Sequence, residues 1–355
     1  MIRTVIPLIS RSTVGQHKVK VIRNLPRQRC LSILLLFLLL LFPASTWGQK
    51  LERVILAFGS SGGNLTPFWV AREAGLYRAH GLDVDVVFLR GSTTAINALA
   101  AREAQFAALG ASSSVLAALG SVDTILIATA APGLSFYLVA KKEITAAAGL
   151  KGRKLAVSRP GTDSDFAARL ALQKVGLNER EVDIISIGSD TERIAALKQG
   201  VVDATVLAPA AYVAAQKLGF HALLDLNALN IPYEAAALIT TRRLIRENAE
   251  MVTRFTRGFA AGIHYAKSHR DFTLRVLQKY MRTDDPDVLN MSYDYYVERV
   301  IPRVPYVSEA GLETVLDFIK RHNPQAANAR AGDFMDNRFI RELEEKGFIR
   351  ALYGR

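Results

Sequence analysis

Residues 54–67 have the sequence VILAFGSSGGNLTP, and the rest of the chain follows the pattern that this stretch begins. The apolar run Val54–Phe58 predicts a buried strand, and the glycines, serines and asparagine at 59–64 predict the loop that ends it. Pro67 is placed to begin a helix that continues to His80, just before Gly81. A second apolar run, Val84–Leu89, completes a strand–helix–strand unit, which is the building block of a parallel sheet.

The same alternation extends along the chain from this stretch. Further strands are expected at Phe106–Leu109, Thr124–Ala130, Phe136–Ala140, Lys154–Val157, Val182–Ile187, Ala204–Leu207, Ala222–Leu226 and Ala235–Thr240. Helices are expected to end at Arg102, Val175, Gln199 and Leu218, and another begins near Ser112. From Ile245 onward the pattern predicts mainly helices, at Asn248–Ser268, Phe272–Tyr280, Pro286–Val300, Glu309–Lys320 and Asn337–Glu345. This order indicates an α/β protein with largely parallel sheets.

Two such α/β modules joined in mid-chain predict two lobes with a ligand cleft between them. We expect residues 49–131 to form the first part of lobe I and residues 132–240 to form lobe II. Residues 241–355 would return to lobe I and add the C-terminal helices. The chain would cross between lobes near Ala131-Pro132 and near Ile239-Thr240. Ligands of open α/β sheets bind at the carboxyl ends of the strands, so the strand-to-helix loops would line this cleft.

Residues 1–48 are expected to form a secretory signal peptide. Basic residues without any acidic ones precede the apolar run Ile33–Phe42, and small residues follow at 44–48. The apolar run is too short to cross a bilayer, which takes about 20 residues. Cleavage is expected after Gly48, with Thr46 as the second choice, and the mature chain is expected in the periplasm. A start at Val14, Val19 or Val21 would account for the long basic segment.

The net charge and the number of cysteines are both lower when residues 1–48 are set aside. The chain carries 45 basic and 33 acidic residues; seven of the basic ones lie in residues 1–48, so 38 remain and the net charge is only +5. A basic surface for nucleic acid is therefore not expected. The single cysteine, Cys30, precedes the apolar run, so the mature chain has no thiol for a disulfide or a metal.

The loops that end the predicted strands share hydroxyl side chains. Serines and threonines stand at 60–61, 92–94, 112–114, 158, 162, 164 and 189, where strands give way to helices. Helix N-termini attract anions through free N–H groups and the helix dipole. A small polar or anionic solute, such as a carboxylate or a sulfonate, would suit these loops. Each hydroxyl taken alone is more often a plain helix cap.

Charged residues near these loops leave the charge of the solute open. Arg90 and Arg159 are the nearest cations, and each could pair with an anion or lie free on the surface. Asp163 and Asp190 would repel an anion if they faced inward. They could instead bind an amine or a hydroxylated ring, or simply cap helices.

Four segments give the chain a resemblance to a known family. They are PFWVAREAGLY at 67–77, GLDV at 81–84, LKGRKLAV at 150–157 and ALKQGVVDA at 196–204. In this order and spacing, the mature chain resembles the substrate-binding proteins of ABC transporters in the nitrate/sulfonate/taurine class (the NitT/TauT, SsuA-like family). The resemblance implies a type II periplasmic-binding-protein fold, whose two lobes close on a solute and present it to a permease in the inner membrane.

The resemblance also implies which residues contact the solute. The loops after the first strands of each lobe correspond here to Ser60, Ser61, Asn64, Ser92, Thr93, Ser112, Ser113, Thr162, Asp163, Ser164 and Ser189, and the loop after Leu207 adds Pro209 and Tyr212. A monomer is expected from the same family.

Two other kinds of function remain as alternatives. Pyrimidine synthases of thiamine biosynthesis resemble these binding proteins, but they rely on a cysteine-rich segment that the mature chain lacks. Residues 59–63 match the Gly-x-Ser-x-Gly pattern of hydrolases, although the helix that should follow at once begins only at Pro67. A receptor domain for a sensor is the other alternative, with Tyr293–Tyr296 and Tyr306 as a possible partner surface or as ordinary helix packing.

We expect no enzymatic activity, no cofactor and no metal site. The chain has no His-Glu-x-x-His pair and no phosphate-binding Gly-Lys-Ser/Thr loop. The histidines of the mature chain are scattered. His264 and His269 are five residues apart, a spacing that does not place them on one helix face.

Overall fold

The computed structural model describes residues 51–321 and 323–354. The predicted signal peptide at 1–48 and its cleavage site lie outside these residues. Ten strands form two five-stranded sheets with the orders β2-β1-β3-β10-β4 and β7-β6-β8-β5-β9. The strands are β1 Glu52–Phe58, β2 Leu82–Phe88, β3 Phe106–Leu109, β4 Thr124–Pro132, β5 Tyr137–Ala140, β6 Lys154–Val157, β7 Asp183–Ser186, β8 Ala204–Leu207, β9 His221–Asp225 and β10 Glu234–Thr241.

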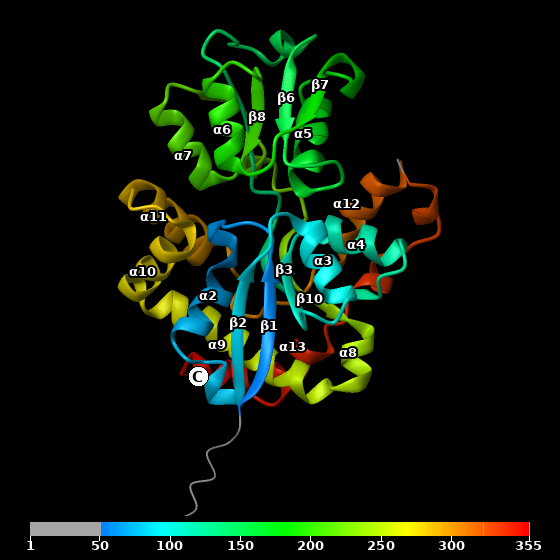
Figure 1. The fold of residues 1–355 in the computed structure, drawn as a ribbon, viewed down its shortest axis with the longest axis vertical. Coiled ribbons are helices and arrows are strands. Elements are labelled where there is room, and N and C mark those ends of the chain that lie inside the picture. The colour runs from blue at the N-terminus through cyan, green and yellow to red at the C-terminus, as the bar shows by residue number, and fades with distance from the viewer. Residues whose placement is uncertain (1–50, 322, 355) are drawn as a thin grey trace, which may run out of the picture. The chain divides into compact units, whose positions relative to one another are not determined.

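Helices surround both sheets (Figure 1). The α-helices are α2 Thr66–Glu73, α3 Ser92–Ala100, α4 Ala111–Leu119, α5 Asp163–Lys174, α6 Asp190–Lys198, α7 Pro209–Lys217, α8 Arg242–Glu247, α9 Ala249–Ser268, α10 Arg270–Met281, α11 Pro286–Ser292, α12 Glu309–Lys320, α13 Arg338–Glu345 and α14 Phe348–Leu352. Shorter turns are η1 Gly63–Leu65, η2 Arg78–His80, η3 Ala147–Leu150, η4 Glu179–Glu181, η5 Asn227–Leu229, η7 Pro324–Ala326 and η8 Ala331–Phe334, and η6 Tyr293–Val300 is a π-helix. No helix in the described part of the chain is both long and apolar enough to span a membrane.

Each sheet is mixed rather than wholly parallel. In the first sheet, β1 runs parallel to β2 and β3, whereas β10 runs antiparallel to β3 and β4. In the second sheet, β6 runs parallel to β7 and β8, whereas β5 runs antiparallel to β8 and β9. One strand therefore opposes its neighbours in each sheet, and in both cases it is the strand by which the chain enters that sheet from the other.

The two crossings between sheets lie side by side. The first crossing is the segment between β4 and β5, and the second is the segment between β9 and β10. The N–H group of Gly133 donates to the carbonyl of Tyr233 over 2.8 Å, which joins them. The second crossing was predicted at Ile239-Thr240, and this was wrong, because β10 already belongs to the first sheet. The sequence indicates a strand in this region, but no local pattern indicates which of the two sheets the strand joins.

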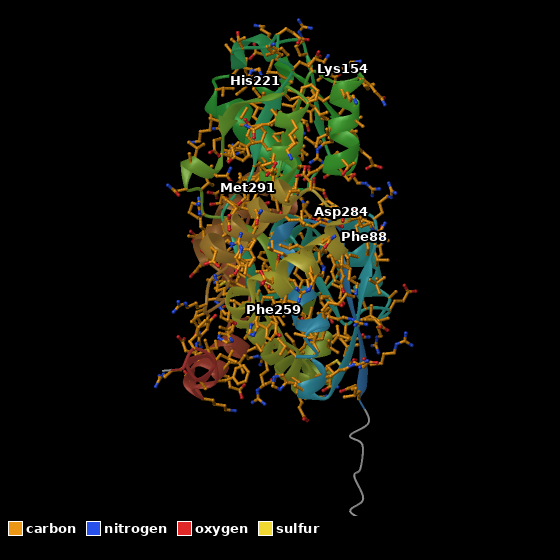
Figure 2. The ribbon with its side chains drawn as sticks, turned by 90° about the vertical axis from the view of Figure 1, so that its left-hand side faces the viewer. Phe88, Lys154, His221, Phe259, Asp284 and Met291 are labelled. Carbon is orange, nitrogen blue, oxygen red and sulfur yellow. The ribbon has the colours of Figure 1, made fainter. Side chains whose placement is uncertain are left out.

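We call the first sheet with its helices the first lobe, and the second sheet with α5, α6 and α7 the second lobe. In the first lobe, α9 packs on α2. The ring of Phe259 in α9, labelled in Figure 2, stacks on the ring of Phe68, with 4.5 Å between their centroids. In the second lobe, α5 and α6 pack on β8. A further core includes Leu126, Leu155 and Phe166, so apolar packing continues from one sheet to the other.

Two predicted helices differ from the structure for local reasons. The helix expected to reach His80 ends at Glu73, because Gly75 adopts a left-handed backbone with φ of 70°. The helix expected at Pro286–Val300 changes after Ser292 into the π-helix η6. π-helical turns are rare in proteins, and those that occur often lie at functional sites.

A buried carboxylate stands where the second crossing enters the first sheet. Glu234 is 0% exposed, and it accepts hydrogen bonds from the Thr129 hydroxyl (2.5 Å) and from the Ser308 N–H group (2.6 Å). Burial outweighs these two bonds and raises the pKa of Glu234 to about 7. This residue thus connects β4, β10 and the start of α12 at the cost of holding a carboxyl group away from water.

Replacing Glu234 with glutamine is expected to stabilise the protein at high pH and to change little near pH 4. Because the folded-state pKa lies above the ordinary value of 4.5, folding favours the protonated form. Stability is therefore lost as the pH rises from about 4.5 to about 7, by about 3 kcal/mol at most. The amide cannot ionise, so urea unfolding at pH 5 and pH 8 should show a smaller difference for Glu234→Gln. The exposed Glu103→Gln serves as the control and should retain the wild-type difference.

Candidate functional site

The predicted site loops lie at facing edges of the two sheets. Strands β1, β2 and β3 are parallel, so the loops that follow them share one edge of the first sheet. The loops that follow β6, β7 and β8 share one edge of the second sheet for the same reason. Two contacts join these edges: Ser112 with Asp163, and Arg90 with Glu192.

The first-lobe edge carries polar side chains that no other part of the described chain uses. Ser60 and Ser61 are exposed in the loop after β1, and Ser92 and Thr93 begin α3. Among the predicted site residues, those whose side chains have no hydrogen-bond partner in the described chain are Ser60, Ser61, Asn64, Ser92, Thr93 and Ser113. These groups are available to a molecule from outside the chain.

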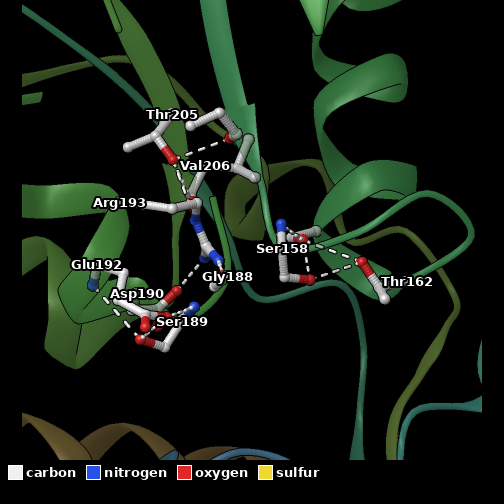
Figure 3. Close-up of polar contacts among 11 residues, drawn as sticks. Ser158, Thr162, Gly188, Ser189, Asp190, Glu192, Arg193, Thr205 and Val206 are labelled. Atoms are coloured by element: carbon white, nitrogen blue, oxygen red, sulfur yellow. Dashed lines mark hydrogen bonds and ion pairs between the residues drawn. The ribbon is translucent and has the colours of Figure 1, made fainter. Parts of the chain in front are cut away.

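The second-lobe edge holds a cluster of hydroxyl groups (Figure 3). The Ser158 Oγ atom lies 2.8 Å from both the Thr162 and the Ser164 hydroxyl oxygens. The Thr162 hydroxyl also contacts the carbonyl of Arg159 at 2.7 Å. Of the predicted residues here, Thr162 and Ser164 are therefore already tied into the loop after β6, and they give it a fixed shape.

Helix capping does not account for most of these residues. Helices α3, α4, α5 and α7 begin without a side-chain cap, and the residues in the cap positions are Gly91, Gly110, Thr162 and Ala208. Uncapped starts also occur at α2, α10, α13 and α14. Ser189 is the exception among the predicted residues, because it caps α6 in a reciprocal capping box with Glu192. The plain capping role is thus correct for Ser189 and does not hold for Thr162.

Asp163 joins the two lobes directly. Its Oδ1 atom accepts hydrogen bonds from the Ser112 hydroxyl and from the Tyr233 hydroxyl, both at 2.7 Å. Gly110 is needed beside it, because a Cβ atom there would overlap the carboxylate. Burial raises the pKa of Asp163 to about 6 although both hydrogen bonds lower it. Asp163 is therefore neither a helix cap nor a freely solvated charge.

Tyr233 was not predicted as a site residue. It is 1% exposed, and its ring stacks on Phe166 of α5 at 4.8 Å between centroids. Its hydroxyl reaches Asp163 from the second crossing, which places three separate segments at one carboxylate. Nothing in the local sequence marks Tyr233, since a tyrosine before a strand is an ordinary core residue.

Arg193 was also missed, and it fixes two loops of the second-lobe edge (Figure 3). It is 2% exposed and donates to the Thr205 hydroxyl and to the Val206 carbonyl, each at 3.1 Å. It also donates to the Gly188 carbonyl and pairs with Asp190. Asp190 is therefore paired within the lobe. A signal was present in the sequence, because Arg193 lies on the same helix face as the buried Ala196 and Leu197.

The two arginines near the loops differ in their surroundings. Arg90 forms an exposed ion pair with Glu192 of the second lobe at 2.7 Å. Arg159 has no ion-pair partner within residues 51–321 and 323–354. Its Cζ atom lies 3.6 Å from the point where a Cβ on Gly91 would stand, beside the uncapped start of α3. An unpaired cation and free N–H groups thus come together where the lobes meet.

Three tyrosines, Tyr137, Tyr212 and Tyr295, come from β5, α7 and η6. Tyr212, a predicted site residue, stacks on Tyr137 at 4.4 Å, and its hydroxyl accepts from the N–H group of Ala222. The Tyr295 hydroxyl donates to Asn227 at 2.7 Å and lies 2.9 Å from the Ser135 oxygen. Pro209, the remaining predicted residue, is the buried first residue of α7.

A cavity of about 460 Å³ opens between α7 and the segment from α11 to η6. Its lining residues are Val213, Gln216, Lys217, Asp287, Asn290, Met291, Asp294, Tyr295 and Arg299 (Met291 in Figure 2). Lys217 crosses this boundary and pairs with Asp285 and Asp287, each at 2.7 Å. No group of three or more His, Cys, Asp or Glu side chains suited to a metal ion occurs in the described part of the chain.

A family model described as NMT1/THI5 like matches residues 63–271, which is more than half of the chain. The chain belongs to the NMT1/THI5-like family. Among curated relatives, this NMT1/THI5-like chain is 24% identical over 230 residues to a Brucella abortus (strain 2308) protein whose name describes a binding protein without giving a ligand. The match covers 62% of this chain and 71% of the relative.

Solved structures share the fold of this NMT1/THI5-like protein at low sequence identity. A protein of Bordetella bronchiseptica RB50 aligns with a TM-score of 0.73 and 18% identity, over 84% of this chain and 98% of that one. The alkanesulfonate-binding protein SsuA of Xanthomonas axonopodis pv. citri, bound to MOPS, aligns with a TM-score of 0.66 and 14% identity, over 81% and 99%. The periplasmic nitrate-binding protein NrtA of Synechocystis PCC 6803 aligns with a TM-score of 0.66 and 11% identity, over 84% and 89%.

These matches confirm the family resemblance and the fold inferred from the sequence. The NMT1/THI5-like chain has the periplasmic-binding-protein fold, with two α/β lobes. The contact residues that the resemblance implied, from Ser60 to Tyr212, stay predictions.

Proposed function

We propose that this protein is the extracytoplasmic solute-binding component of an ABC importer. It captures a small polar or anionic organic solute between its lobes and delivers it to a permease in the inner membrane. The fold, the family and the names of the matched proteins support this role. The predicted periplasmic location and the monomeric state belong to the same proposal.

The observation that carries the proposal is the set of unused polar groups where the lobes meet. The uncapped start of α3 supplies N–H groups, Ser92 and Thr93 supply free hydroxyls, and Arg159 supplies an unpaired cation from the other lobe. A carboxylate or sulfonate group would satisfy all three and would pull the lobes together.

A thermal-shift panel tests this proposal with ligand-stripped protein. The panel contains sulfonates, carboxylates, nitrate, pyrimidines and aromatic acids. A solute that binds only the folded state at a concentration of about 100 times its Kd stabilises it by about 3 kcal/mol. Small-angle scattering should show a more compact particle with the same compound. If no compound raises the melting temperature and one of them is chemically converted, the protein is an enzyme instead.

Replacing both Ser92 and Thr93 with alanine is expected to weaken binding of any compound found by this panel about tenfold or more, because two hydrogen bonds to the solute are lost. Neither hydroxyl has a partner in the described chain, so the melting temperature without solute should stay unchanged. Thr253→Ala is the control, since the Thr253 hydroxyl contacts only the Ala249 carbonyl on the surface of α9. An equal fall in affinity for both variants would argue against a solute at α3.

An enzyme of the same fold is the second candidate, because the matching family model is named for NMT1/THI5-like proteins. The sequence of residues 51–354 contains no cysteine, so the chemistry expected of a cysteine-rich segment has no residues to perform it here. Incubation with pyrimidines followed by product analysis separates this candidate from a binding protein.

A further inference from the structure

Asp163 differs from the other carboxylates at the facing edges in having no cationic partner. Asp190 pairs with Arg193, Glu192 pairs with Arg90, and Asp165 pairs with Arg169, which leaves none of these three charges alone. Asp163 contacts two neutral hydroxyls, and no described cation lies close enough to lower its pKa. A largely buried negative charge without a cation is unfavourable unless another group supplies hydrogen bonds or a positive charge.

The carboxylate of Asp163 still has acceptor capacity. Both protein donors, Ser112 and Tyr233, bond to its Oδ1 atom. The Oδ2 atom receives no hydrogen bond from the described residues, and it lies in the space that a Cβ atom on Gly110 would occupy. An ionised carboxylate can accept about four hydrogen bonds, so the lone pairs of Oδ2 remain unused by the described residues.

The residues around the Asp163 carboxylate are each held in place by the fold. Tyr233 is held by stacking on Phe166, Ser112 is fixed in the first turn of α4, and Gly110 lacks the Cβ atom that would push the carboxylate away. Its pKa of about 6 shows that the charge is not fully compensated by these groups. Three segments from both lobes thus converge on one acceptor that is only half used.

We propose that Asp163 selects the solute by accepting hydrogen bonds at Oδ2 from a cationic, N–H or O–H group of the solute. This inference rests on the proposed function, because it concerns the same meeting point of the lobes. Asp163 would be a negative recognition element, in addition to the positive one formed by Arg159 and the start of α3. The expected substrate class is a small organic solute that carries a hydrogen-bond donor apart from any acidic group, and purely anionic solutes would bind more weakly.

Matched compounds of equal length test this selection. One set is aminoethanesulfonate, hydroxyethanesulfonate and propanesulfonate, and the other is aminopropanoate, hydroxypropanoate and butanoate. These six are added to the panel above, and affinities are measured by calorimetry for every compound that binds. Bound compounds are expected to carry a donor group, and within a set the donor-bearing members should bind about tenfold or more tightly than the member with a methyl end.

Asp163→Asn should reverse this preference. Asparagine retains an acceptor for Ser112 and Tyr233 and places an NH₂ donor where Oδ2 stood. Donor-bearing solutes should lose about tenfold or more in affinity, while donor-free anions should gain. Asp183→Asn is the control with the same change of charge, because Asp183 is exposed at the start of β7 in the same lobe.

Tyr233→Phe gives a second test if the asparagine variant does not fold. It removes one protein donor but retains the carboxylate and the ring that stacks on Phe166. The preference for donor-bearing compounds should persist in this variant, and its disappearance would overturn the proposal. Equal binding of donor-bearing and donor-free compounds to the wild type, or unchanged affinities in Asp163→Asn, would also overturn it while leaving the solute-binding function intact. Absence of binding by every compound contradicts the proposed function itself.

Discussion

Replacement of Arg193 by methionine is expected to destabilise the protein by about 3 kcal/mol, because several buried hydrogen bonds of one guanidinium group are lost together. Methionine fills a similar volume, so the loss reflects polar contacts rather than a cavity. The Gly188 and Val206 carbonyls would lose their donor, and Asp190 would lose its cation. The variant would therefore leave several polar groups without partners inside the second lobe.

Urea unfolding followed by circular dichroism measures this effect. Arg180→Met is the matched control, because Arg180 is exposed in the same lobe and its side chain forms no hydrogen bond or ion pair with other described residues. The stability of Arg193→Lys should lie between those of the two methionine variants. A lysine retains the positive charge but lacks the planar guanidinium group that donates to several acceptors at once. Similar stabilities for the two methionine variants would show that Arg193 does not hold the loops together.

The same variant should also weaken solute binding. Arg193 connects the loop after β7, through Gly188, with the end of β8, through Val206. These loops carry Ser189 and Pro209, which belong to the predicted site. Positions of binding groups must be held to within a fraction of an ångström for full affinity, so loosening both loops lowers affinity even where the lobe remains folded.

Replacement of Gly110 by alanine is expected to leave the fold intact but to separate the lobes at Asp163. Gly110 has φ of −71° and ψ of 153°, which any residue can adopt, so no backbone strain is introduced. The added methyl group would occupy the position of the Asp163 carboxylate. The carboxylate must then turn away and lose its hydrogen bonds to Ser112 and Tyr233.

Solute affinity should fall about tenfold or more in Gly110→Ala, and scattering should show a less compact particle in the presence of solute. Gly332→Ala is the control, because a Cβ atom there meets nothing within 4 Å. The effect should vanish in an Asp163→Ala background, where the space is already free. A double-mutant cycle with no coupling between the two positions would contradict this account.

The sequence predicted most elements of the fold because their causes are local. Strands such as Val54–Phe58 and Thr124–Ala130 are apolar runs between turn residues, and the structure has β1 at Glu52–Phe58 and β4 at Thr124–Pro132. The π-helix at Tyr293–Val300 was not predicted, since a helical spacing over eight residues does not separate a π-helix from an α-helix. The sheet that accepts β10 depends on contacts with strands more than 100 residues earlier.

The candidate site could be predicted only in outline for the same reason. The position of the loops follows from the ends of the strands, and the Ser189 cap follows from Glu192 three residues later. The role of Asp163 depends on Ser112 and Tyr233, which are 51 and 70 residues away in the chain. No local pattern connects these residues, and only the folded chain shows that the carboxylate lacks a cation.

The place of β10 within the first sheet has a consequence for the order of folding during synthesis. All strands of the second sheet have been made once the chain reaches Asp225, whereas β10, which lies between β3 and β4, ends at Thr241. The strands synthesised first therefore belong to the sheet that is completed last. Until residue 241 has left the ribosome, the edges of β3 and β4 that will receive β10 are unpaired and open to incorrect pairing.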